Sequence, residues 1–196
     1  YSALASTWES IGINTAFISE KLAADKAFRE ELAKRAIRVF IIFPVFNNEE
    51  AIKDDSSLYA VTNSGSRAQQ EWLRFVCPSR SAYREYLNEK MTEVISELKP
   101  DGVSIDFIRQ FVYWEKIYPD RDPSGIEKAC YCDSCLARFE REYGKEIPAG
   151  TVTTSEKAAW IEQNCPAEWD EFRCRLITSM VSELSETAHR ACADIS

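Results

Sequence analysis

The sequence predicts an α/β fold built around a parallel β-sheet. Three short apolar runs have the composition of buried strands: 13–19, 38–46 and 102–108. Helices are predicted at 25–37, 81–98, 134–143 and 167–191 from the spacing of their apolar residues. Strands that alternate with helices in this way form parallel sheets with right-handed crossover connections.

The central strand and the helix after it have the clearest local patterns. The run "RVFIIFPVF" (38–46) is apolar throughout, which is typical of a strand buried on both faces. The helix at 81–98 is amphipathic and ends before Pro100. Residues 47–80 and 109–129 have neither pattern, so they are expected to form mainly long loops.

Two architectures fit this order of elements: a doubly wound sheet and a (β/α)8 barrel of the TIM type. A complete barrel needs eight strands and about 250 residues, whereas three strands are predicted in these 196 residues. We therefore expect residues 1–196 to form a single domain, an incomplete barrel of about three or four β/α units.

The composition limits the classes of partner. Acidic residues outnumber basic ones, 32 to 24, and a net charge of −8 argues against nucleic acid as a partner. The sequence has no run of about 18 apolar residues, so no membrane span is expected. The first residues lack the pattern of a signal peptide. The five tryptophans fit a well-filled core better than sugar stacking, although both remain open.

Three of the seven cysteines are crowded into "ACYCDSC", at Cys130, Cys132 and Cys135. Seven cysteines cannot all pair within one chain, and two cysteines one residue apart rarely form a disulfide because the geometry is strained. Zinc prefers four soft ligands in a tetrahedron, and cysteine-rich turns supply them. The spacing therefore favours a zinc site. The alternatives are a disulfide with free thiols, or a reactive thiol pair.

The fold indicates where the fourth ligand lies. Cys77 is late in the loop after strand 38–46, and the three crowded cysteines follow strand 102–108. Loops that follow parallel strands share one edge of the sheet, so Cys77 is expected beside them, with Cys165 as the second choice. Four thiolates leave no open position for water, so the zinc would be structural. It would be held in a loop insertion around 109–150.

A carboxylate stands near the carboxyl end of strand 102–108, where the active sites of parallel α/β folds lie. Asp106 could act there as a nucleophile or as an acid/base in glycoside hydrolysis, with Arg109 orienting it. The alternative is a structural ion pair between Asp106 and Arg109. Spacing alone favours neither.

Other candidate site residues lie in the adjoining loops. The candidates for sugar contacts are Asn47, Tyr113 and Trp114. A second carboxylate is not evident: Glu49, Glu50 and Glu115 are in suitable loops, although acidic loop residues are usually just solvated. The lone histidine is expected on a helix surface, so a Ser–His–Asp mechanism has no support.

Four segments, in this order, resemble glycoside hydrolases of the (β/α)8 class: "VCPSRSAYREYL", "DGVSIDFIR", "CYCDSCLARFEREYG" and "WDEFRCRLITSMVSEL". They are similar to the family 10-like hypothetical glycosyl hydrolases, whose strand-four motif resembles "DGVSIDFIR" and is often followed by a CYCxxC segment. The resemblance covers roughly residues 75–190. It implies a bacterial, carbohydrate-degrading hydrolase with a periplasmic or extracellular location.

The cysteine pattern is also similar to that of family 42 β-galactosidases, in which a cysteine before a helix and a C-x-C-x-x-C segment hold a structural zinc. The matching residues are Cys77, Cys130, Cys132 and Cys135. Those enzymes carry an Asn–Glu pair at the end of strand four, where this chain has Phe107 and Ile108. The resemblance therefore does not supply the acid/base. Asp106 is the surviving carboxylate, and its partner is expected on a later strand.

Taken together, the sequence predicts the catalytic-domain portion of a glycoside hydrolase that acts on an oligo- or polysaccharide and contains a structural zinc. A non-catalytic carbohydrate-binding or assembly module is the first alternative, because only one carboxylate is evident. A thiol-based redox protein or zinc sensor is the third hypothesis.

Overall fold

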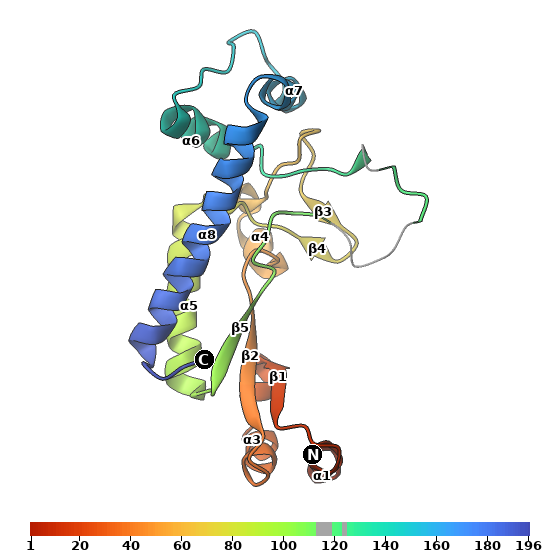
Figure 1. The fold of residues 1–196 in the computed structure, drawn as a ribbon, viewed down its shortest axis with the longest axis vertical. Helices are drawn as coiled ribbons and strands as arrows, with labels where there is room; N and C mark the ends of the chain where they lie inside the picture. The colour runs from red at the N-terminus through yellow and green to blue at the C-terminus, as the bar shows by residue number, and fades with distance from the viewer. Residues whose placement is uncertain (113–118, 123–124) are drawn as a thin grey trace. The chain divides into compact units, whose positions relative to one another are not determined.

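The computed structural model describes residues 1–112, 119–122 and 125–196. They form two compact units. Unit 1 comprises Tyr1–Val45, Glu85–Phe107 and Ser182–Ser196, and unit 2 comprises Phe46–Arg84 and Ile108–Val181. Figure 1 shows two long helices, α5 (Ser81–Leu98) and α8 (Pro166–Ala191). Each has residues in both units. The organisation as a single domain stays a prediction.

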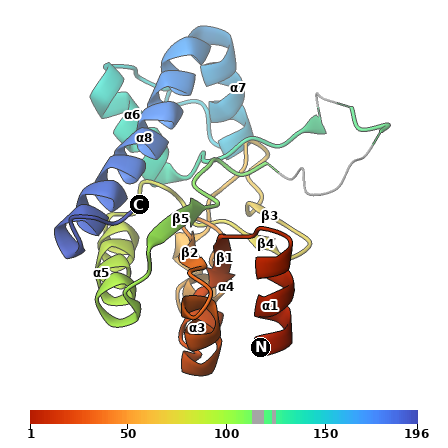
Figure 2. The ribbon, with the colours of Figure 1, turned by 60° about the horizontal axis from the view of Figure 1, so that its bottom comes forward.

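Unit 1 contains a parallel three-stranded sheet in the order β1–β2–β5 (Figure 2). The strands are β1 (Thr15–Ser19), β2 (Arg38–Pro44) and β5 (Gly102–Asp106). In register, Thr15 lies beside Arg38, and Phe40 lies beside Gly102. Each strand of the sheet is next to the one before it, as in the wall of a barrel. The predicted α/β fold with a parallel sheet is confirmed.

Helices cover one face of this sheet. The helices before β2 are α1 (Ser2–Ser10), α2 (Glu20–Ala23) and α3 (Lys26–Ala33), and the last two contact β2. Successive side chains of a strand point to opposite faces, and along β2 the buried ones are Val39, Ile41 and Phe43. Asp25 caps α3 by accepting the Phe28 backbone N–H at 3.1 Å.

The opposite face of the sheet carries an aromatic pair. The ring centroids of Phe17 and Phe40 lie 5.1 Å apart, and the Phe40 ring lies over Gly102 of β5. A Cβ atom on Gly102 would be only 2.2 Å from Cε1 of Phe40, far inside van der Waals contact. Alternation along β5 places Ser104 and Asp106 on this same face.

Unit 2 combines short elements with an aromatic core. Its elements are α4 (Glu49–Asp54), the 3-10 helix η1 (Ser56–Leu58), the antiparallel strands β3 (Gln69–Gln70) and β4 (Leu73–Arg74), α6 (Asp133–Tyr143) and α7 (Thr154–Asn164). The ring of Trp169 in α8 lies 4.8 Å from that of Tyr131, 4.9 Å from that of Phe139 and 5.3 Å from that of Phe172. All four side chains are fully buried, so this tryptophan fills the core.

The structure differs from the sequence-based expectation in the connecting segments. The region 47–80, expected to be mainly a loop, contains α4, η1 and the β3–β4 hairpin. Helix α7 was not predicted, and Thr153 and Glu156 form a capping box at its start. Helix α3 ends before the predicted boundary, and the chain turns at Ala36, whose φ is 52°. Within the described ranges, no helix is long and apolar enough to cross a membrane.

We expect Gly102→Ala to destabilise unit 1, because the added methyl group overlaps the Phe40 ring. Overpacking of this kind costs about 1–3 kcal/mol of unfolding free energy. Urea denaturation followed by circular dichroism measures the loss, and adding Phe40→Leu should restore part of it. Gly150→Ala is the matched control, since a Cβ there meets no atom within 4 Å. An equal loss in the control would contradict the steric explanation.

Candidate functional site

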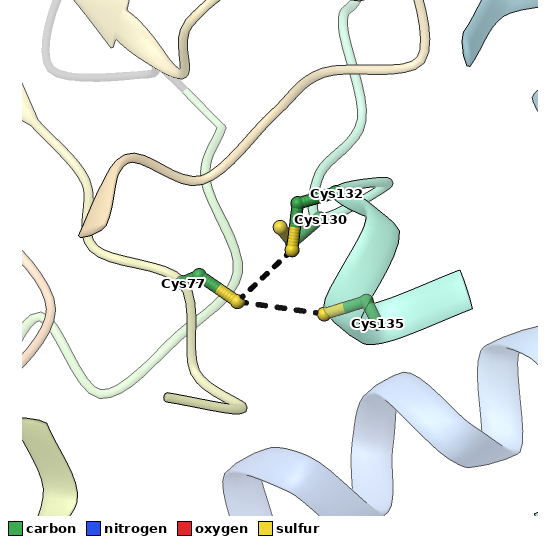
Figure 3. Close-up of side chains that lie close together, drawn as sticks. All are labelled: Cys77, Cys130, Cys132 and Cys135. Atoms are coloured by element: carbon green, nitrogen blue, oxygen red, sulfur yellow. Dashed lines mark hydrogen bonds between the residues drawn. The ribbon is translucent and has the colours of Figure 1, made fainter. Parts of the chain in front are cut away.

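Four cysteine sulfurs meet inside unit 2 (Figure 3). The Sγ atoms of Cys77, Cys130, Cys132 and Cys135 all lie within 4.8 Å of one another, and all four residues are buried. Sγ of Cys77 is 3.4 Å from that of Cys132 and 3.5 Å from that of Cys135. The cysteine before α5 therefore lies against the three at the start of α6.

The sulfur distances fit a metal site better than disulfides. A disulfide requires about 2.05 Å between its sulfurs, and all seven cysteines are free. Four thiolates, each about 2.3 Å from one tetrahedral ion, would lie about 3.8 Å from one another. The observed spacings are close to that value, so the four cysteines could hold one metal ion.

Protein contacts fix the loop that leads into α6. Thr62 and Ala129 form an antiparallel bridge, and the backbone N–H of Tyr131 donates to the carbonyl of Val61 at 2.7 Å. The Tyr131 hydroxyl donates to Glu162 of α7 at 3.0 Å. In the sequence Tyr131 lies between Cys130 and Cys132, so its burial positions both cysteines.

Other contacts fix the loop that carries Cys77. The backbone N–H of Cys77 donates to the carbonyl of Leu58 at 2.8 Å. The guanidinium of Arg84, in the first turn of α5, donates to the carbonyl of Pro78 at 3.1 Å and to that of Leu176 in α8 at 3.3 Å. These bonds place the Cys77 backbone through protein contacts alone.

Sequence reasoning missed two hydrogen-bonding groups next to the sulfurs. The Ser79 hydroxyl lies 3.1 Å from Sγ of Cys77 and 3.1 Å from Sγ of Cys135, and the backbone N–H of Val61 donates to Sγ of Cys130 at 3.4 Å. Such donors orient and stabilise metal-binding thiolates. Cys135 lies in the first turn of α6, where the helix dipole also favours negative charge. Ser79 follows Cys77 closely in the sequence, whereas no sequence pattern points to Val61.

The four thiols cannot all ionise in this buried cluster without a cation. Hydrogen bonding with Cys130 lowers the pKa of Cys132 far below its ordinary value and also lowers the pKa of Cys77. Burial raises the pKa of the Cys130 thiol, and hydrogen bonding with Cys130 raises the pKa of Cys135. The cluster therefore shares its negative charge unevenly. A divalent ion would supply the positive charge that four thiolates need.

The remaining cysteines and the histidine lie outside the cluster. Cys165, the second choice as a ligand, is buried between α7 and α8, and burial raises the pKa of its thiol. Cys174 and Cys192 are exposed. His189 is exposed on α8, as expected, and its Nδ1 lies 2.8 Å from the carbonyl of Ser185.

Asp106 ends β5 in unit 1, and its side chain is exposed. Oδ1 accepts the backbone N–H of Phe107 at 2.7 Å, and Phe107 has a left-handed backbone with a φ of 50°. In the sheet register Asp106 lies beside Pro44, on the face away from the helices. A carboxylate in this place can act on a ligand held over the carboxyl ends of the strands.

Two other predicted residues make contacts within unit 2. Arg109 donates to the carbonyl of Val112 at 2.6 Å, and its guanidinium lies over the ring of Phe75, 5.1 Å from the centroid. Asn47 accepts the backbone N–H of Arg74 at 2.9 Å through Oδ1. Both side chains therefore hold the backbone or packing of their own region. Their roles toward Asp106 and toward a sugar stay predictions.

The last candidates lie at the edges of what the structure describes. Tyr113, Trp114 and Glu115 lie outside the described residues. Glu49 and Glu50 occupy the first turn of α4, where carboxylates complement the helix dipole. Glu49 also pairs with Lys53 at 3.1 Å. These two acids are therefore surface residues of a short helix.

Comparisons with known proteins support the barrel class. No protein-family model and no curated protein sequence matches this chain. The β-galactosidase from Rahnella sp. R3 is similar, with a TM-score of 0.63 and 14% identity over 97% of this chain and 31% of that chain. α-L-Fucosidase isoenzyme 2 from Paenibacillus thiaminolyticus has a TM-score of 0.60 and 15% identity over 97% of this chain and 27% of that chain. A GH42 β-galactosidase from G. stearothermophilus has a TM-score of 0.60 and 12% identity over 98% of this chain and 32% of that chain.

At these identities the likeness shows the fold alone. The chain spans about a third of the length of the structures it matches. It is therefore similar to one part of a (β/α)8-barrel glycoside hydrolase, consistent with the partial barrel that the sequence predicts. The similar structures are β-galactosidases and a fucosidase, and they give no support to the family 10-like label.

We expect the protein to bind one divalent metal ion per chain, and Cys77→Ser to weaken binding at least tenfold. Serine nearly preserves the size of the side chain but removes a soft thiolate donor. Elemental analysis after dialysis measures the stoichiometry, and protons should compete for the thiolates as the pH falls. Cys174→Ser is the matched control at an exposed cysteine. Retention of the ion by Cys77→Ser would contradict the assignment.

Proposed function

We propose that the protein is the catalytic-domain portion of a glycoside hydrolase acting on an oligo- or polysaccharide, with Asp106 as a catalytic carboxylate. The position of Asp106 carries this proposal. It lies at the carboxyl end of a parallel strand, on the sheet face away from the helices. In a (β/α)8 barrel that face lines the interior, and its carboxyl end holds the active site. The solved structures that share the fold are glycosidases by name, which agrees with this proposal.

Asp106 would act as a nucleophile or as an acid/base. Glycoside hydrolysis uses two carboxyl groups, one to protonate the leaving oxygen and one to attack the sugar or activate water. Phe107 holds Oδ1 of Asp106, and no described residue engages Oδ2, which can therefore face a substrate. Arg109 remains a proposed orienting partner, and the candidates for sugar contacts remain Asn47, Tyr113 and Trp114.

We further propose that the metal is zinc and that its role is structural. A buried set of four thiolates suits a soft, tetrahedral ion. Four protein ligands leave no coordination position for water, so the ion would not take part in hydrolysis. It would join the Cys77 loop to the start of α6.

A non-catalytic carbohydrate-binding module is the second candidate. Phe107 and Ile108, which follow Asp106, cannot transfer protons, so β5 ends with a single carboxylate. Glycan binding without turnover would favour this candidate. The thiol-sensor hypothesis is weakened by the burial of all four clustered cysteines, because reactive cysteines are partly exposed.

We expect Asp106→Asn to lower kcat by about 100- to 10,000-fold, the range for the loss of an acid/base group. A panel of aryl glycosides and oligosaccharides provides the assay, and the amide preserves the shape of the side chain. Asp194→Asn is the matched control, because Asp194 is an exposed acid in the same unit. Unchanged turnover by Asp106→Asn would exclude Asp106 from the mechanism.

We expect elemental analysis of the purified protein to find zinc, and a chelator to lower the Tm by about 10 °C. An ion present at 1,000 times its Kd contributes about 4 kcal/mol, and each kcal/mol is worth about 2–4 °C in a chain of this size. Cys77→Ser should show little further loss with the chelator. If the chelator leaves the Tm of the zinc-loaded protein unchanged, the structural role of the metal is wrong.

A further inference from the structure

A polar cavity of about 360 Å³ lies beside β3 in unit 2. Its lining includes Gln69, Gln70, Phe111, Arg121, Ile126 and Glu127. The volume is within the range of small-molecule sites, about 300–1,000 Å³. The lining combines two amides, a guanidinium and a carboxylate with two apolar side chains, and none of these residues belongs to the cysteine cluster.

A hydrogen bond from Tyr59 fixes the orientation of the Gln69 side chain in this cavity. The Tyr59 hydroxyl donates to Oε1 of Gln69 at 2.9 Å. The Tyr59 ring is itself covered by the guanidinium of Arg67, 4.9 Å from its centroid. With the amide oxygen engaged, Nε2 retains two N–H donors that no described residue accepts. Gln69 therefore offers pre-oriented donors.

Glu127 is oriented in the same way but as an acceptor. Its Oε1 accepts the hydroxyl of Thr62 at 3.0 Å and that of Ser64 at 2.5 Å. Thr62 is fully buried, so this anchor is rigid. Among the residues that the structure describes, none donates to Oε2 of Glu127. A second carboxylate oxygen is therefore fixed and available.

We propose that this cavity is a binding subsite for a glycosyl unit with neutral hydroxyl groups. A sugar hydroxyl both donates and accepts, so one ligand can satisfy Oε2 of Glu127 and the N–H donors of Gln69. The free carboxylate oxygen of Glu127 repels a second carboxylate, which favours a neutral ligand over a uronate. Phe111 is buried, and its ring packs against that of Phe75 with 5.5 Å between the centroids, so it holds this side of the cavity in place. The subsite rests on the proposed glycan-directed function, which it extends.

The test measures binding of four neutral sugars (galactose, glucose, lactose and cellobiose) and of galacturonate and glucuronate to the protein. Nuclear magnetic resonance titration follows the side-chain amide signals of Gln69, a readout that needs no variant. At least one neutral sugar should shift these signals saturably, and the uronates should bind at least tenfold more weakly.

Two isosteric variants then probe the oriented groups. Glu127→Gln keeps an oxygen for Thr62 and Ser64 but replaces Oε2 with a donor, and Gln69→Glu keeps the acceptor for Tyr59 but removes the N–H donors. Each should weaken sugar binding about tenfold, whereas Glu146→Gln, at an exposed acid of the same unit, should not. Thermal melting checks that the variants fold.

The proposal is overturned if no sugar shifts the Gln69 signals saturably, if the uronates bind as tightly as the neutral sugars, or if both folded variants bind like the wild type. These outcomes are separate from the fate of the proposed function. Binding here is measured without turnover, and the catalytic role of Asp106 is judged by kcat alone.

Discussion

Four buried thiols can all ionise only beside a cation, and unit 2 brings four cysteine sulfurs within 4.8 Å of one another. Two of the clustered cysteines, Cys77 and Cys132, are 55 residues apart in the chain. The elements of unit 2 before α5 are short, and the hairpin strands have two residues each. Such elements bury little surface of their own. The aromatic core therefore contributes much of the organisation of this unit, and a metal ion held by the four cysteines would add to it.

The features that the sequence predicted well have patterns confined to a few neighbouring residues. The three strands are apolar runs, and the parallel sheet follows from their alternation with helices. The grouping of Cys77 with the "ACYCDSC" cysteines needed one further step, because it depends on the rule that loops after parallel strands share an edge. That rule is general enough to relate distant cysteines without any knowledge of their packing.

The features that sequence could not predict depend on contacts between distant segments. The β3–β4 hairpin has strands too short for any periodicity, and the donor to Cys130 is a backbone N–H at Val61, which no side-chain pattern marks. The amide oxygen of Asn47 holds the backbone N–H of Arg74, 27 residues away, a contact that no local pattern marks. Helix α7 is different. Its capping box, Thr153 with Glu156, can be read from the sequence, but the helix lacks the strong apolar face that would predict it.

The ring of Phe40, which lies across Gly102, has a consequence for where polar chemistry can occur on the sheet. One side chain fills the width of two strands at that level, so the pair of Phe17 and Phe40 forms an apolar floor on this face. Asp106 stands four residues farther along β5, about 13 Å above it at the usual rise of a strand. This face is therefore apolar at the level of the amino end of β5, and its polar side chains, Ser104 and Asp106, lie toward the carboxyl end.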